Sequence, residues 1–132
     1  MKPFVKAVAA LVLTMVASSS IQAAGKPALA DALVGRAWIE TTPPSGLPGV
    51  MLIFLPGGTL LMDSCWETYA LRKWTRTAPD AVAWDEDGAR ITATVVSVSA
   101  SQLSLRIKAG KDSVEHRYSA AKVPYVCPDM KR

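Results

Sequence analysis

The amino-acid sequence predicts an all-β fold, a small antiparallel meander of about eight strands closed into a barrel, and two patterns carry that prediction. Short runs rich in Val, Ile, Thr and aromatic residues are separated by turn residues at regular spacing along the chain. In the last two runs apolar and polar residues alternate, which places one set of side chains on the inner face of a strand. The core predicted from this alternation includes Leu103, Leu105, Ile107, Val114 and Tyr118.

The individual strands follow from the position of the turn residues. Pro56-Gly57-Gly58 predicts a tight turn between two strands, and Ala109-Gly110-Lys111-Asp112 predicts another. Pro124 and Pro128 prevent the tail from extending a central strand. In chain order, the predicted strands span residues 36–42, 50–55, 59–65, 67–76, 81–84, 89–98, 102–108 and 113–120.

The N-terminal residues have the pattern of a secretory signal. Two lysines precede the apolar run AVAALVLTMVA, which is followed by small residues. We therefore predict a signal peptide over residues 1–23, with cleavage after Ala23 or Ala24, and a single domain over residues 24–132. The apolar run is too short for a membrane span and no second long apolar run follows, so we expect an exported protein, periplasmic or secreted, without a transmembrane segment in the mature chain.

The charge of the chain gives no indication of a nucleic-acid partner. The formal net charge is +4, and it falls to +2 when Lys2 and Lys6 leave with the signal peptide. A charge of this size, scattered along the chain, is ordinary for a soluble domain.

Cys65 and Cys127 are the two cysteines of the sequence. In an exported protein an even number of cysteines indicates a disulfide, and the spacing lacks the close Cys-x-x-Cys pairing of metal or redox sites. Such a bond closes a loop of about 60 residues, which contributes ~4 kcal/mol in the chain-entropy model.

Candidate ligand-binding residues cluster on one predicted strand and on the only histidine. The segment from Trp66 to Arg76 mixes aromatic and basic side chains, which suits stacking on a ligand and pairing with its charge. The alternative is that one set of aromatics fills the barrel while the basic residues face water. If the barrel binds a ligand, the cavity should open near this strand and His116. The candidate residues are Trp66, Tyr69, Trp74, His116 and Tyr118.

His116 lies on the apolar face of its predicted strand, beside Val114 and Tyr118. An inward histidine is either a ligand-binding group or general base, or a core imidazole held by a local hydrogen bond. We expect a mostly neutral imidazole fixed by a hydrogen bond. A hydrolase that uses His116 and a serine stays open as an alternative, although the sequence contains no Gly-x-Ser-x-Gly nucleophile motif and we assign no catalytic residue.

The acidic run Asp85-Glu86-Asp87-Gly88 offers three carboxylates beside a glycine. It resembles half of a calcium loop, but the later ligand positions, including the bidentate Glu, are missing. Asp-Gly is a favoured hairpin pair, so we expect a solvated turn. We predict no metal site and no cofactor.

Several motifs resemble those of small bacterial secreted lipocalin-like proteins. Gly35-Arg36-Ala37-Trp38 is similar to the opening of such domains, and Phe54-Leu55-Pro56-Gly57-Gly58-Thr59-Leu60 resembles their second-to-third strand hairpin. A weaker resemblance is to the META-domain family, one segment of which is similar to Asp63-Ser64-Cys65-Trp66-Glu67-Thr68-Tyr69. Either resemblance implies a β-fold in the cell envelope and supplies no catalytic residues.

The function expected from these observations is non-enzymatic binding in the cell envelope. An eight-stranded barrel is just wide enough to hold its own side chains or one small ligand. The expected partner is a small apolar or amphipathic ligand, or an envelope protein. The alternatives are a structural or inhibitory module without a ligand cavity, and a small hydrolase that uses His116.

Overall fold

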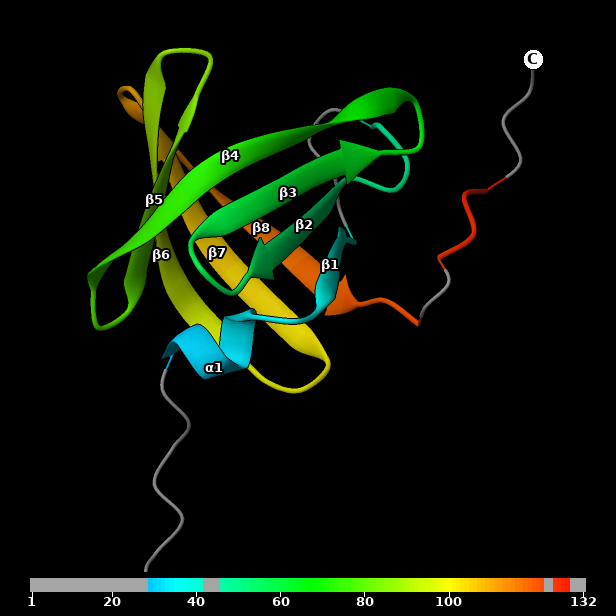
Figure 1. Ribbon diagram of the computed structural model, residues 1–132, viewed down its shortest axis with the longest axis horizontal. Helices are drawn as coiled ribbons and strands as arrows, with labels where there is room; N and C mark the ends of the chain where they lie inside the picture. The colour runs from blue at the N-terminus through cyan, green and yellow to red at the C-terminus, as the bar shows by residue number, and fades with distance from the viewer. Residues whose placement is uncertain (1–28, 42–45, 123–124, 129–132) are drawn as a thin grey trace, which may run out of the picture.

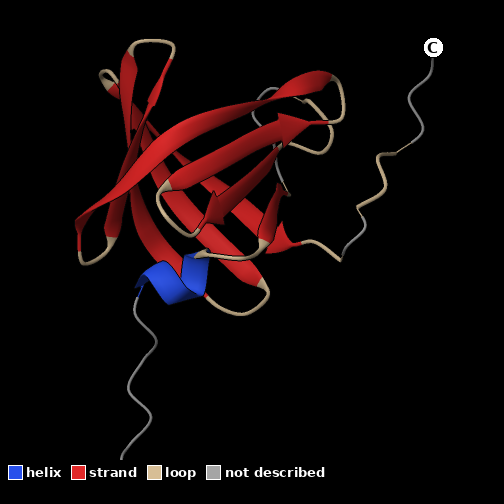
Figure 2. Cartoon of the chain, in the orientation of Figure 1, coloured by secondary structure: helices blue, strands red, loops and turns tan. Residues whose placement is uncertain are grey.

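The computed structural model describes residues 29–41, 46–122 and 125–128, and these form one eight-stranded barrel (Figure 1). The predicted signal peptide, residues 1–23, lies outside the described residues. One short helix precedes the strands, and the rest of the barrel is strand and turn (Figure 2). The elements are α1 (Leu29–Leu33), β1 (Ala37–Glu40), β2 (Met51–Leu55), β3 (Thr59–Ser64), β4 (Glu67–Ala78), β5 (Ala81–Glu86), β6 (Ala89–Val98), β7 (Gln102–Ala109) and β8 (Asp112–Ala120).

The predicted antiparallel meander is confirmed, and it closes on itself. Each strand pairs with the next, and β8 returns to pair with β1 through Trp38–Ala120, Ile39–Ser119 and Glu40–Tyr118. Closure leaves no sheet edge open for pairing with another chain. The architecture is consistent with the lipocalin-like fold that the sequence resembles.

The turns alternate between the two ends of the barrel. At one end lie the β2–β3, β4–β5 and β6–β7 turns together with α1; at the other lie the β1–β2, β3–β4, β5–β6 and β7–β8 connections. The β5–β6 turn has two residues, Asp87 and Gly88, with φ of 49° and 86°. Such a turn fits the right-handed strand twist, and it lets β5 continue to Glu86, beyond the predicted end at Trp84.

The α1 end of the barrel is filled by large side chains. Leu33 of α1 is fully buried, and its carbonyl oxygen accepts a hydrogen bond of 3.0 Å from Nε1 of Trp38. The rings of Phe54 and Trp74 meet edge to face, with centroids 5.3 Å apart. The most deeply buried side chains of the barrel are Leu33, Trp38, Phe54, Leu60, Val82, Trp84, Leu103 and Leu105.

The core predicted from alternation is confirmed for Leu103, Leu105 and Tyr118 and is wrong for Val114. Ile107 is half-buried, whereas Val114 is 47% exposed. The two residues pair across β7 and β8, close to the turn at the end away from α1. Alternation predicted the face on which Val114 lies, but that end of the barrel is not filled, so the side chain stays accessible.

The predicted disulfide is confirmed. Cys65, in the β3–β4 turn, is bonded to Cys127 of the tail, with the two Cα atoms 5.7 Å apart and a sequence separation of 62. Gly49 lies against this bond with a φ of +71°, and a Cβ on it would stand 2.3 Å from Sγ of Cys65. Only glycine fits at this position, where the β1–β2 connection, the β3–β4 turn and the tail meet.

Candidate functional site

The barrel end away from α1 contains an open cavity of about 610 Å³. Its walls come from β1–β8 and the connection before β2, because inward residues near this end are too small or too far apart to fill the space. The apolar part of the lining consists of Leu47, Val50, Met51, Leu52, Met62, Ala70, Trp84, Ile91, Ile107 and Ala109. The polar part consists of Glu40, Asp63, Glu67, Thr68, Arg72, Glu86, Asp87, His116 and Tyr118.

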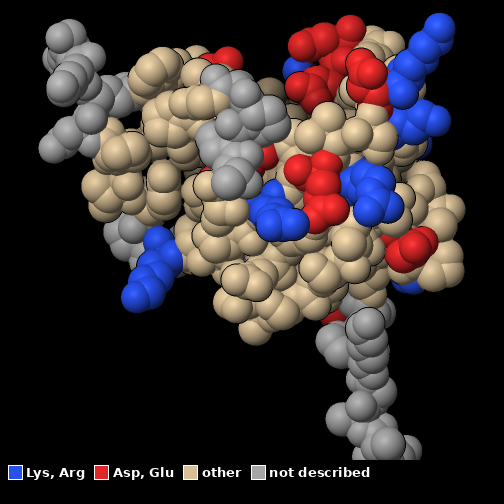
Figure 3. Space-filling view, turned by 180° about the vertical axis from the view of Figure 1, so that it is seen from behind, with Lys and Arg blue, Asp and Glu red and all other residues tan. Residues whose placement is uncertain are grey.

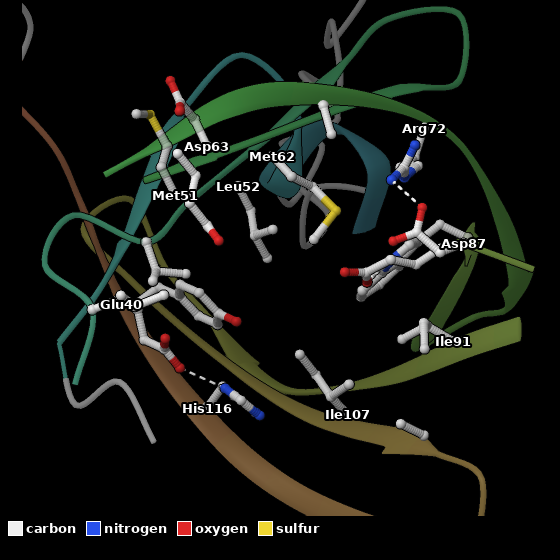
Figure 4. A pocket seen from close by; sticks show the side chains of 18 of the residues that line it. Glu40, Met51, Leu52, Met62, Asp63, Arg72, Asp87, Ile91, Ile107 and His116 are labelled. Carbon is white, nitrogen blue, oxygen red and sulfur yellow. Dashed lines mark hydrogen bonds and ion pairs between the residues drawn. The ribbon is translucent and has the colours of Figure 1, made fainter. Parts of the chain in front are cut away.

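The close view of the cavity shows two polar pairs on opposite sides (Figure 4). Glu40 and His116 lie on one side, and Arg72 and Asp87 on the other. The side chains of Leu52, Met62 and Ile107 project into the space between them. A molecule in this cavity therefore meets apolar surface in the middle and charged groups at two sides.

The Glu40–His116 pair crosses the seam where the barrel closes. The Nδ1–H of His116 donates to Oε1 of Glu40 over 2.5 Å, and the two side chains are only 20% and 3% exposed. The two residues are 76 positions apart in sequence and meet because β1 pairs with β8. The expectation that a hydrogen bond fixes His116 is confirmed, and its neutral charge stays a prediction.

Tyr118 stands beside this pair and opposite Glu40 in the strand register. Its ring stacks on that of His116, with centroids 6.4 Å apart, and the residue is 4% exposed. Burial, and secondarily the negative charge of Glu40, raise the pKa of the Tyr118 phenol far above its ordinary value. The hydroxyl therefore stays protonated, and none of the described residues forms a hydrogen bond with it.

Arg72 is the cation of the opposite wall. Its Nη2 donates to Oδ1 of Asp87 over 2.9 Å, and its side chain is 28% exposed. Its Nε is buried and has no hydrogen-bond partner among the described residues. Lys73 and Arg76 are exposed, as the alternative of outward basic residues had it, whereas Arg72 lies on the inner face of β4.

The aromatic residues proposed for ligand binding lie in three different environments. Trp66 and Tyr69 are 58% and 60% exposed and lie outside the cavity, while Trp74 belongs to the filled end and donates from Nε1 to the Leu55 carbonyl oxygen. His116 and Tyr118 line the cavity together. As expected, the cavity opens beside β4 and His116, but β4 contributes Glu67, Thr68, Ala70 and Arg72 to its wall.

The acidic run ends in the expected hairpin turn: Asp85 and Glu86 close β5, and Asp87 and Gly88 form the turn to β6. Its three carboxylates point to three different partners: Asp85 to Arg90, Glu86 to Nε1 of Trp84, and Asp87 to Arg72. Within the part of the chain that the structure describes, no group of three His, Cys, Asp or Glu side chains is arranged to hold a metal ion.

The surroundings of His116 define what the site can do chemically. Its Nδ1 is occupied by Glu40, an arrangement that orients an imidazole. Among the described residues that line the cavity there is no serine or cysteine; Thr68 is the residue with an aliphatic hydroxyl there. The arrangement is suited to holding a molecule through hydrogen bonds and apolar contact.

The fold and cavity define a class: an eight-stranded antiparallel barrel with one filled end and one open, internally lined end. Comparisons of the chain with protein-family models, with curated proteins and with solved structures yield no match. Among residues 29–41, 46–122 and 125–128, no helix has both the length and the apolar character needed to cross a membrane.

Proposed function

We propose that this protein is an exported, lipocalin-like, non-enzymatic binding protein that holds a small amphipathic ligand in the open end of its barrel. The observation that carries the proposal is the open cavity of about 610 Å³. Its size falls within the range of about 300–1,000 Å³ typical of small-molecule sites, which combine apolar walls with a few placed polar groups. A barrel whose only task is structural gains stability by filling this space.

Two further observations support export to the cell envelope or beyond. The disulfide between Cys65 and Cys127 is of the kind that persists in oxidising compartments. The first residues of the chain have the charge, apolar run and small residues of a secretory signal. Both fit a protein that meets its ligand outside the cytoplasm.

The experiment that tests the proposal blocks the cavity with one added ring. Ala70 is half-buried on the inner face of β4 and lines the cavity, whereas its neighbour Leu71 is 54% exposed on the outer face. Binding of N-phenyl-1-naphthylamine, an uncharged apolar dye, is followed by fluorescence. We expect Ala70→Phe to weaken dye binding by roughly tenfold or more, because the ring occupies the space of the ligand.

Leu71→Phe is the matched control, since it adds an aromatic ring one residue away on the opposite face. It should leave dye binding unchanged, and both variants should melt close to the wild-type temperature. Equal dye binding by wild type and Ala70→Phe would place the dye elsewhere and contradict the proposal.

A further inference from the structure

We infer that the ligand of this cavity is a cationic amphiphile, with an ammonium group among carboxylates at the mouth and an apolar tail among the side chains beneath. This inference rests on the proposed function and names the chemical class of the ligand. It is carried by the balance of charges around the cavity, by three carboxylates that form no ion pair, and by the Tyr118 hydroxyl, which lines the cavity without a partner among the described residues.

Carboxylates outnumber cations in the lining. Five acidic side chains line the cavity, against the guanidinium of Arg72 and the imidazole of His116. The lining therefore carries a net charge of −3 if His116 is protonated and −4 if it is neutral. Seen from behind, acidic side chains gather at one upper edge of the molecule, with basic side chains beside them (Figure 3).

Three of the five carboxylates accept hydrogen bonds from neutral groups only. Glu86 accepts from the indole of Trp84, Glu67 from the hydroxyl of Ser64, and Asp63 from the amide of Ser64. Among the described residues none of the three forms an ion pair. A ligand with a positive charge supplies the counter-charge that the protein leaves out.

The single guanidinium of the lining does not reverse this balance. Arg72 is neutralised by Asp87, at 2.9 Å, and both lie on the wall opposite Glu40 and His116 (Figure 4). An anionic ligand that approached the remaining donors of Arg72, including its unpartnered Nε, would also approach Asp87 and the other carboxylates, which costs like-charge repulsion.

Tyr118 provides a second, independent indication that a polar group of a ligand enters the cavity. It is 4% exposed, lines the cavity, and its hydroxyl forms no hydrogen bond with the described residues. The hydroxyl is accessible from the cavity and has no partner among the described residues, so a ligand group that bonds to it gains affinity. The phenolic oxygen can accept from an ammonium N–H, and Glu40 lies opposite Tyr118 in the strand register, so its carboxylate is close to the same ligand group.

The shape of the site strengthens the attraction. Apolar walls of low dielectric concentrate the field of charges at the mouth of a cleft. The tail of an amphiphile then contacts Leu52, Met62 and Ile107, while its head group stays near the carboxylates. Neither a purely apolar molecule nor an anion uses both parts of the lining.

The experiment compares three ligands that share a ten-carbon tail: decylamine, decanol and decanoate. At pH 7 the amine is protonated, since primary amines of this kind titrate near pH 10.4, as lysine does. Affinities are measured by calorimetry on the mature wild-type protein. We expect decylamine to bind roughly tenfold or more tightly than decanol, with decanoate weakest. The preference for the amine should shrink as salt is added.

Variants identify the groups responsible. Glu86→Gln and Glu67→Gln each remove one uncompensated carboxylate and should weaken decylamine binding roughly threefold to tenfold, with decanol unchanged. Arg72→Gln removes the guanidinium from the described lining of the cavity and should strengthen decylamine binding. Asp80→Asn is the matched control: it removes one exposed acid from the β4–β5 turn, at the opposite end of the barrel, and should change nothing.

The outcomes separate this inference from the function on which it rests. Decanol or decanoate binding as tightly as decylamine would overturn the cationic ligand while leaving the binding function in place. Failure of all three ligands, together with failure of the uncharged dye, would overturn both. A salt-sensitive amine preference in wild type supports the inference even where a variant fails to fold.

Discussion

The two ends of the barrel are built from the same eight strands, yet one is filled and the other is hollow. On β7, Leu105 is completely buried toward the α1 end, whereas Ile107, two residues further along the same face, is half-buried in the cavity wall. The filled end closes around the rings of Trp38, Phe54 and Trp74. The hollow end has methionines, alanines and charged groups in the equivalent positions. Tight packing and open space are therefore divided along the barrel axis.

The largest effect should come from the disulfide, which ties the tail to the hollow end. We expect replacement of Cys65 and Cys127 by serine to lower the free energy of unfolding by ~4 kcal/mol, because the bond closes a loop with 62 residues of sequence separation. Denaturant unfolding of the double variant and the wild type measures the difference. A loss below about 1 kcal/mol would mean that the strands alone hold this end together.

The second prediction compares neighbours on β7. Leu105→Ala should cost about 3 kcal/mol of unfolding free energy, because it opens a void in packed surroundings. Ile107→Ala should cost only about 1 kcal/mol, because its side chain borders space that is already open. Urea unfolding of both variants gives the two values, and Arg106→Ala between them serves as the exposed control. Equal losses at Leu105 and Ile107 would contradict the division into filled and hollow ends.

The third prediction concerns Tyr118, which lies between the two ends, and the loss of unfolding free energy at alkaline pH. The folded-state pKa of Tyr118 is raised, so the unfolded chain loses this proton first, and stability falls as the pH rises above the unfolded pKa of about 10. At pH 11 the resulting loss in wild type is about 1.4 kcal/mol. Tyr118→Phe should not show this part of the loss of unfolding free energy at alkaline pH. Denaturant titrations of both proteins at pH 8 and pH 11 measure the difference. Parallel losses in wild type and variant would show that the hydroxyl titrates as if exposed.

The fourth and smallest effect on stability should come from Glu86→Gln in the cavity wall. Glu86 accepts a hydrogen bond from Nε1 of Trp84, and a glutamine oxygen accepts the same bond. The melting temperature should therefore stay within a few degrees of wild type, since surface changes of this kind alter stability by about 0.5 kcal/mol or less. A large drop would make Glu86 a structural residue and remove it from the ligand site.

Strand alternation in the sequence predicted the inner face of β7 and β8, and with it the inward position of His116 and Tyr118. The same parity applied to β4 points to Arg72, which lies two residues before the buried Trp74. Sequence reasoning missed it because basic residues are ordinarily assigned to the wet face of a strand. Alternation gives the face but not the height along the barrel axis, which is why Val114 was expected in the core.

Glu40 could not be found from the sequence in the same way. It meets His116 only because β8 returns to β1, and the register of that closing pair is set by barrel closure between residues 76 positions apart. The cavity is the space that the inward side chains at this end do not fill, so it depends on their packing in three dimensions. No local pattern reports it, although the alanines and methionines on inner positions at one end are consistent with it.

The most direct test of the hollow end is a map of ligand contacts by methyl NMR during titration with decylamine. We expect chemical-shift changes and ligand contacts at the methyl groups of Leu52, Met62 and Ile107, with none at Leu33 and Leu103 of the filled end or at Leu71 on the outer face. Perturbations centred on Leu71, or spread equally over both ends of the barrel, would contradict a ligand site in the hollow end.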